Sequence, residues 1–380
     1  LQPAPSPLRP ACQVNERLFL WKGLNTPPPS VIDSPMIHLL VDVAHRASLR
    51  DTSAYSAGLR KFHLFCDIFS VPEVERLPAS FTILHSFALW AVSDPAIIPL
   101  PHSGVIFEPV SVTTVKKYLA AVRAWHIVQG WPPLLAESHF TRINWSLRGM
   151  ANIIGSLRRR PLCPPITVTM LWCLRSILHL SDPFKACLWA LATCSFWGMM
   201  RLGEVTVPSR ASFDPTKHLK RSDVSFDKDL DGRTYARLNL PTAKTAAPGQ
   251  VQSVCVLAND SLCPVEALLH LSTVVPAGSY PLFSWRDPQG TIRPMVKKTA
   301  MAKLNLILVA NGFGTAFGHS FRIGGASYYL AQGVSPEIVR IGGRWRSTVY
   351  ELYIRSFEQV LSRHLPTVIG GRIAVPAPRV

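Results

Sequence analysis

A short segment rich in proline and arginine, at residues 155–166, divides this chain into two halves. It reads GSLRRRPLCPPI, and its three prolines lack a backbone N–H, so neither a helix nor a central strand can run through it. The chain of 380 residues is long enough to build two hydrophobic cores. We therefore predict two separately packed domains, joined by a linker at residues 156–166.

The N-terminal half predicts an all-α domain behind a proline-rich start. Residues 1–36 are rich in proline, which is typical of an extended, flexible arm. In residues 51–69 and 111–130, apolar side chains recur every three or four positions, as on one face of a helix. We expect this helical domain to span residues 37–155.

The C-terminal half predicts a mixed domain over residues 167–358, mostly helical with a small antiparallel sheet. Short strands are expected at 224–226, 234–240 and 251–256. Apolar or amphipathic patterns predict helices at 167–180, 183–199, 262–273, 295–311, 318–332, 335–341 and 349–364. The fold class expected is thus an all-α domain followed by a mixed α/β domain, with a C-terminal tail at residues 359–380.

The charge balance favours a polyanionic partner. The chain carries 40 Lys and Arg against 23 Asp and Glu, a formal net charge of +17, which suits nucleic acid but also serves solubility alone. Lys116, Lys117 and Arg123, on the helix expected at 111–130, are either phosphate contacts or a solvated face. The run Arg158, Arg159 and Arg160 is a phosphate clamp, a short nuclear address or simply part of the linker.

Several other classes of protein are disfavoured. The longest strongly apolar stretch without a charge, residues 186–200, is too short for a membrane span. The eight cysteines form no C-x-x-C pair, which favours a reduced, intracellular protein. Zinc spacing, a glycine-rich nucleotide loop and clustered carboxylates are missing from the sequence, so we expect neither a metal nor a cofactor.

What remains is an ordered set of residues in the C-terminal half. Arg201-Leu202-Gly203-Glu204 follows an apolar helix, and Lys244 lies between two expected strands. His319-Ser320-Phe321-Arg322 opens a helix, and Gly342-Gly343-Arg344-Trp345 precedes one that carries Tyr353. Arginines can hold the nonbridging oxygens of a phosphodiester while a hydroxyl attacks the phosphorus, without a metal ion.

At these residues the sequence resembles the tyrosine recombinase (phage integrase) family. The resemblance covers about residues 166–358, and over 318–355 it is closest in character to Cre recombinase and the Crypton-type recombinases of fungal mobile elements. Residues 37–155 fit the family's core-binding domain only in their helical character. The resemblance implies a site-specific DNA recombinase or integrase of a mobile element, acting on double-stranded DNA without metal or ATP.

The resemblance also implies a role for each residue that binds the phosphate. Arg201 and Arg322 hold the scissile phosphate and stabilise the pentacoordinate transition state. His319 hydrogen-bonds that phosphate and assists proton transfer near neutral pH. Glu204 orients Arg201 and His319.

The remaining roles concern the nucleophile, the leaving group and a packing residue. Tyr353 attacks and forms a 3′-phosphotyrosine, Lys244 protonates the departing 5′ oxygen, and Trp345 donates its indole N–H to the phosphate and packs against the nucleophile's helix. Tyr350 competes with Tyr353, because the gap from Trp345 to Tyr353 is one residue shorter than in Cre recombinase. Lys220 competes with Lys244 but precedes the expected strands.

Assembly and location follow from the same resemblance. Family members act as dimers on DNA that join into a tetramer, and residues 359–380 either dock on a neighbouring subunit or fold back. Residence is nuclear in a eukaryotic host and at the nucleoid otherwise. Two alternatives use similar residues: a type IB topoisomerase acting as a monomer, and a domesticated DNA-binding protein without activity.

Overall fold

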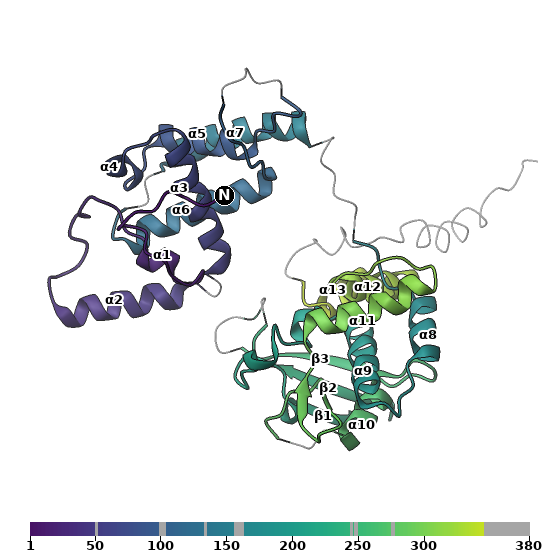
Figure 1. The fold of residues 1–380 in the computed structure, drawn as a ribbon. Helices are drawn as coiled ribbons and strands as arrows, with labels where there is room; N and C mark the ends of the chain where they lie inside the picture. Colours follow the sequence, from purple (N-terminus) through teal and green to yellow (C-terminus); the bar gives the residue numbers. More distant parts are fainter. Residues whose placement is uncertain are drawn as a thin grey trace, which may run out of the picture. The chain divides into compact units, whose positions relative to one another are not determined.

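The computed structural model describes residues 1–49, 52–98, 104–132, 135–155, 163–243, 246, 250–274 and 278–345. These residues belong to two compact units, Leu1–Arg160 and Pro161–Val380, shown in Figure 1. The described chain is mostly helical, with small antiparallel sheets, as the sequence predicted. Within the described ranges, every helix is too short or too polar to cross a bilayer.

The N-terminal unit is all helix and has its own apolar core. Its central helices meet through aromatic side chains, and the ring centroids of Phe62 and Phe87 lie 5.5 Å apart. Ser111 caps the helix that carries Lys116, since its hydroxyl accepts from the Thr114 N–H at 3.2 Å. The helices are α1 (Arg17–Leu20), α2 (Pro35–Ser48), α3 (Ser53–Ile68), α4 (Glu73–Arg76), α5 (Phe81–Val92), α6 (Val112–Val128) and α7 (Glu137–Ile154).

The N-terminal segment corrects one expectation in part, because Arg9, Leu18 and Trp21 pack on this unit, whereas residues 28–36 are mostly exposed. Leu18 is fully buried in the unit's core, and the carbonyl of Trp21 accepts a 2.8 Å hydrogen bond from Trp125 Nε1. Arg9 Nη1 lies 2.6 Å from Glu73 Oε1. The prolines shape the backbone, but large apolar side chains between them supply the burial energy that holds it.

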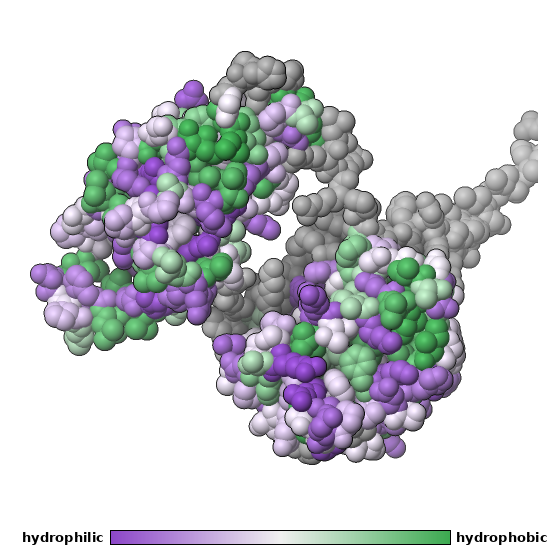
Figure 2. Space-filling model, viewed as in Figure 1, coloured by the Kyte–Doolittle hydropathy of each residue, from purple (hydrophilic) through white to green (hydrophobic). Residues whose placement is uncertain are grey.

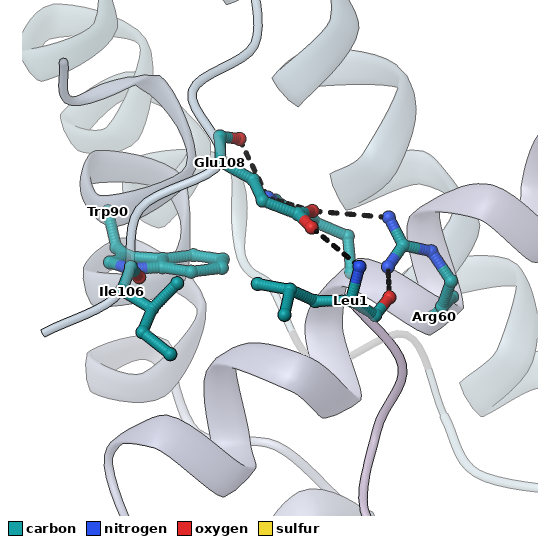
Figure 3. A network of polar contacts seen from close by, with 6 residues as sticks. Leu1, Arg60, Trp90, Ile106 and Glu108 are labelled. Carbon is teal, nitrogen blue, oxygen red and sulfur yellow. Dashed lines mark hydrogen bonds and ion pairs between the residues drawn. The ribbon is translucent and has the colours of Figure 1, made fainter.

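A buried ammonium group helps to hold α3 in place. Lys61 is 1% exposed, and its Nζ donates to the backbone carbonyl of Glu108 at 2.7 Å and to Glu108 Oε2 at 2.9 Å. Figure 3 shows that the Glu108 carboxylate also meets Arg60. The cation therefore has an opposite charge within contact distance inside its own unit.

Helix α2 is an exception in its unit, because none of its residues is buried. Its apolar side chains are largely exposed, with Met36 at 67% and Leu39 at 63%. Figure 2 shows apolar surface along this helix, on the lower left.

The C-terminal unit surrounds one buried helix, α9 (Pro183–Trp197). Asp182 caps it by accepting from the Phe184 and Lys185 N–H groups. Apolar residues lie on every side of α9, which contacts α8, α10, α12 and strand β3. The helices of this unit are α8 (Val168–Ile177), α9, α10 (Pro264–Val274), α11 (Lys297–Ala310), α12 (Ser320–Ala331) and α13 (Pro336–Gly342), with short 3₁₀ turns η1 (Leu202–Glu204), η2 (Arg210–Ser212) and η3 (Arg221–Asp223).

The main sheet is small and antiparallel, as predicted. Strands β1 (Val224–Lys228), β2 (Thr234–Leu240) and β3 (Gln252–Leu257) are antiparallel, with Phe226 opposite Ala236 and Ala236 opposite Val256. A second, two-stranded sheet, β4 (Ser284–Arg286) and β5 (Ile292–Pro294), was not predicted. Its three-residue strands are too short for alternation to show, and Asp287 stabilises the turn by accepting from the Gln289 and Thr291 N–H groups.

Candidate active site

The site begins where α9 ends. After Trp197 the chain turns through Met199, whose φ is +44°, and reaches Arg201. Arg201 Nη1 donates to Glu204 Oε1 at 2.9 Å, while the Arg201 backbone N–H donates to Glu204 Oε2 at 2.9 Å. The Glu204 side chain is 9% exposed and that of Arg201 is 23% exposed, so the arginine keeps access to solvent. The predicted R-x-x-E pair is thus an ion pair beside the C-terminus of α9.

Helix α12 brings the second arginine to the same place. Arg322 is 1% exposed and donates to the backbone carbonyls of Met199 and Gly343. The helix comes this close because Gly325 has no side chain: a Cβ there would lie 2.0 Å from the Phe196 carbonyl oxygen. Arg322 therefore ties the end of α9 to the segment that follows α13.

Trp345 packs directly against Arg322. The Arg322 Cζ lies 4.0 Å from the centroid of the Trp345 ring, a cation–π contact. The indole also covers Gly343, where a Cβ would lie 1.6 Å from the Trp345 ring. Trp345 is 7% exposed, and its expected contacts with the phosphate and with the nucleophile's helix stay predictions.

A third arginine, Arg344, joins the site, although sequence reasoning assigned it no role. Its Nη2 lies 2.7 Å from Glu204 Oε2, so Glu204 bridges two guanidinium groups. Burial lowers the pKa of Arg344, and the nearby charge of Arg201 lowers it further. The sequence did hold one signal for Arg344. The gap from Trp345 to Tyr353 is one residue shorter than the corresponding gap in Cre recombinase, whereas the gap from Arg344 to Tyr353 has the same length.

His319 lies at the N-terminus of α12, in the field of the same charges. Burial lowers its pKa from the ordinary value, and the charges of Arg201 and Arg322 lower that pKa further. Glu204 acts in the opposite direction, to a smaller extent. Lowering this pKa favours the neutral imidazole at pH 7, the form that can accept a proton.

Lys297, the first residue of α11, is a further cation of the site that the sequence did not single out. Its backbone N–H donates to the Val207 carbonyl at 3.1 Å, which fixes the start of α11 near η1. A Cβ on Gly318 would lie 3.4 Å from Lys297 Nζ, so the ammonium group lies beside the residue before His319. Its charge also lowers the pKa of His319.

The cluster as a whole is strongly positive. Three arginines and one lysine come together from four separate parts of the sequence, next to a histidine. The only carboxylate that the described contacts bring to the cluster is that of Glu204. Such an excess of donors and positive charge suits an anion with several oxygen atoms, such as a phosphate.

Comparison with known proteins gives structural likeness only. Neither a protein-family model nor a curated protein sequence matches the chain. The XerH site-specific recombinase bound to its difH substrate matches at 13% identity and a TM-score of 0.46, over 93% of this chain and 95% of that chain. The XerA recombinase matches at 14% identity and a TM-score of 0.39, over 89% of this chain and 100% of that chain. A lambda integrase dimer bound to a core site matches at 12% identity and a TM-score of 0.41, over 84% of this chain and 77% of that chain.

The chain resembles solved site-specific recombinases. Because the identities are 12–14% and the TM-scores stay below 0.5, a functional assignment has to rest on the residues of the site.

Of the other residues predicted for this site, three lie outside the described residues and one, Lys220, lies within them. Lys244, Tyr353 and its competitor Tyr350 lie outside the described residues, so their roles stay predictions. Lys220, the competitor of Lys244, has its ammonium 2.9 Å from Asp223 Oδ1. Which of the two lysines is the proton donor stays a prediction.

The predicted DNA contacts also divide. Lys116, Lys117 and Arg123 are exposed on α6, in the N-terminal unit. Arg123 Cζ lies 5.8 Å from the centroid of the Phe140 ring. Arg158, Arg159 and Arg160 lie outside the described residues. The exposed residues remain available to a phosphate backbone, and their role stays a prediction.

Proposed function

We propose that this chain is a DNA strand-cutting and rejoining enzyme of the tyrosine recombinase type. The observation that supports this most is the convergence of Arg201, Arg322, Arg344 and Lys297 near His319, where Glu204, which contacts Arg201 and Arg344, is the one carboxylate that the described contacts show. A phosphodiester carries one negative charge on two nonbridging oxygens, and more charge develops on them in a pentacoordinate transition state. Guanidinium groups held in place before the reaction stabilise that added charge at little reorganisation cost.

The reaction follows from this arrangement and from a tyrosine nucleophile. The phenolic oxygen of Tyr353 forms a bond to phosphorus, and the bond from phosphorus to the 5′ oxygen breaks. The phenolic proton passes to neutral His319 or to water, and the departing 5′ oxygen takes a proton from Lys244. One phosphate ester bond replaces another, so the 3′-phosphotyrosine keeps the energy needed to rejoin a strand without ATP.

The substrate and assembly are part of the same proposal. The net charge of +17 suits double-stranded DNA, and exposed Lys116, Lys117 and Arg123 on α6 can contact its phosphates. We assign the run Arg158, Arg159 and Arg160 to the same task. Two DNA-bound dimers would form the tetramer that exchanges strands for a mobile element of the Crypton type, in the nucleus if the host is a eukaryote and at the nucleoid otherwise.

The test is covalent capture of DNA. The purified chain is mixed with a pool of randomised duplexes that carry a nick, so that cleavage releases a short fragment and traps the adduct. We expect an SDS-resistant complex whose sequenced DNA converges on one site. The Tyr353→Phe variant should bind DNA but form no adduct, whereas Tyr350→Phe should still form it.

Other outcomes would point elsewhere. If Tyr353→Phe still forms the adduct and Tyr350→Phe does not, the nucleophile is Tyr350. Relaxation of supercoiled plasmid by isolated subunits at high dilution would favour a type IB topoisomerase. DNA binding without any adduct, across all duplexes, would contradict the proposal and favour the inactive DNA-binding protein.

A further inference from the structure

The last residues of the predicted linker lie against α12, the helix that begins after His319. The Ile166 backbone N–H donates to the Ser320 carbonyl at 2.9 Å, and Ile166 is 1% exposed. The two segments come this close because Gly324 has no side chain: a Cβ there would lie 2.0 Å from the Ile166 carbonyl oxygen. We call residues 163–166 the linker strap. Its backbone fits the first two turns of α12.

A side-chain contact adds to this backbone fit. Cys163 Sγ lies 3.4 Å from Ser320 Oγ, and Ser320 is fully buried. The same hydroxyl accepts from the Phe317 N–H at 2.8 Å. The turn from Phe317 to Ser320, which contains His319, is therefore tied to the linker strap.

The linker strap is stiff for its length. Its two middle residues are Pro164 and Pro165, and a proline ring fixes φ at about −65°. A residue that precedes a proline is also restricted to extended conformations. Because so few backbone angles are free, a displacement of the linker at Cys163 passes on to Ile166 and from there to α12.

His319 depends on this turn more than Arg322 does. Arg322 has anchors of its own, because its guanidinium donates to two backbone carbonyls and stacks on the Trp345 ring. The His319 imidazole makes no hydrogen bond to any other described residue. Its position is therefore set by the backbone that carries it, and that backbone is held by the linker strap.

We propose that the linker strap is a positioning element for His319, so that the linker between the two units sets the rate of the chemical step. This inference rests on the proposed recombinase function and deepens it. The arginine run that we assign to DNA phosphates, residues 158–160, immediately precedes the segment that leads into the strap. DNA bound at that run fixes where the strap begins, and the strap fixes the turn that carries the imidazole. Cys163, Ile166 and Ser320 are then positioning residues.

The experiment softens the linker strap without removing its hydrogen bonds. Pro164 and Pro165 are both replaced by Gly, and covalent adduct formation is measured in single turnover, at saturating DNA, on a nicked site. We expect adduct formation to be about 10-fold slower, because a misplaced proton acceptor loses much of its contribution. DNA affinity, measured by fluorescence anisotropy, should change less than about 2-fold, because the phosphate contacts are kept.

A matched control uses the same change elsewhere. Pro28 and Pro29 are an adjacent pair that is exposed in the N-terminal unit. Replacing both by Gly should leave the rate of adduct formation unchanged. Thermal unfolding of each variant shows whether it is folded at the assay temperature.

A double-mutant cycle identifies the group through which the linker strap acts. In a chain that already carries His319→Gln, softening the strap should slow adduct formation less than about 2-fold, because the side chain that it misplaces is gone. Ser320→Ala removes the hydroxyl between Cys163 and Phe317, and it should show the same dependence on His319.

The coupling also has a readout that needs no activity. Hydrogen exchange followed by mass spectrometry on the full chain, without DNA, reports how firmly the turn is held. Peptides that cover residues 317–324 should exchange faster in the chain with the softened strap. Peptides of α10 should be unchanged.

Each possible outcome gives a clear reading. Equal losses with and without His319 would overturn the inference, because the linker strap would then support the fold without acting on the imidazole. An unchanged rate after softening the strap, or unchanged hydrogen exchange at residues 317–324, would also overturn it. If the unaltered chain forms no adduct on any site, the proposed function itself has failed, and hydrogen exchange still decides whether the strap holds α12.

Discussion

The two units of this chain match their buried cations with carboxylates to different extents. In the N-terminal unit three buried cations each contact a carboxylate: Arg9 meets Glu73 at 2.6 Å, Lys61 meets Glu108 at 2.9 Å and Arg76 meets Asp67 at 2.8 Å. Glu108 also contacts Arg60 and the Leu1 amine (Figure 3). In the C-terminal unit Arg201 and the buried Arg344 share Glu204, and the exposed Lys297, beside Gly318, has no acidic partner among the described residues.

This difference separates two uses of the same kind of residue. A balanced buried pair specifies how helices meet, and it presents no unsatisfied charge to a ligand. An unbalanced cluster is costly to the free protein and becomes favourable only when an anion enters. Burial alone does not separate a structural cation from a binding cation, since Lys61 and Arg322 are both 1% exposed.

The largest expected effect is the loss of a cation from the unbalanced cluster. Arg201→Ala should slow covalent adduct formation about 10³-fold, because a donor aimed at the developing charge is lost. Its thermal midpoint should stay near that of the unaltered chain, because Arg344 continues to hold Glu204 and the repulsion between the two arginines disappears. Single-turnover kinetics and calorimetry together measure both. A large loss of stability would instead identify Arg201 as a structural cation and contradict the difference drawn between the two units.

The next effect is the loss of the carboxylate that contacts buried Lys61. Glu108→Gln leaves the Lys61 ammonium buried without an opposite charge, which should cost about 3 kcal/mol. Hydrogen exchange followed by mass spectrometry on the full chain should show faster exchange in α3 and α6, with peptides of the C-terminal unit unchanged.

A double variant controls this prediction. Lys61→Met with Glu108→Gln removes both charges and should recover part of the lost protection, because an apolar side chain tolerates burial. A double variant less stable than Glu108→Gln alone would show that Lys61 contributes mainly through the Glu108 carbonyl and the Trp90 ring, whose centroid lies 4.5 Å from Nζ.

The third effect is a pH dependence that arises from the unbalanced charge. Burial and the nearby cations lower the pKa of His319 from its ordinary value of 6.5. As a proton acceptor His319 works in its neutral form. The rate of adduct formation should therefore be at its maximum above the pKa of His319 in the folded protein and should fall as the pH drops through that pKa. At subsaturating DNA the acid limb should lie below pH 6.5, with a slope approaching tenfold per pH unit.

Two variants test the origin of this limb. His319→Gln should remove it, leaving a slower, flatter profile. Glu204→Gln removes the one described negative charge that raises the pKa of His319, so the limb should move to lower pH. A limb that stays in place in both variants would assign the titration to another group.

The smallest effect concerns exposed cations, which contribute through counterion release. Replacing Lys116, Lys117 and Arg123 together by Gln should weaken DNA binding uniformly across sequences and reduce the salt slope of log K by about 2 to 3. The folded stability should change little, because these side chains are exposed on α6. Fluorescence anisotropy over a salt series measures the slope, and an unchanged slope would identify them as a solvated helix face.

Patterns local in sequence were reliable guides to the fold. The helix expected at 183–199 is found at Pro183–Trp197, and the strand expected at 234–240 has those bounds. The helix is a long apolar run that begins after Asp182, and the strand begins after the turn at Asp231-Gly232. The proline-rich start was misjudged, because whether Leu18 and Trp21 find a core depends on distant helices.

The candidate site could be predicted only where a residue type and its neighbours already imply the chemistry. Arg201 with Glu204, and His319 with Arg322, are such pairs, and the structure brings them together. Arg344 and Lys297 carried no such signal. Their relevance comes from contacts with Glu204 and Gly318, which lie 140 and 21 residues away in the sequence.

The sequence by itself determined the order of helices and strands and the chemical kinds of residue available for a phosphate site. Only the tertiary structure decided which cations and carboxylates come together, and therefore where the uncompensated charge lies. The reason is physical: periodicity and capping act over a few residues along the chain, whereas electrostatic balance acts through space and depends on every element that packs around a charge.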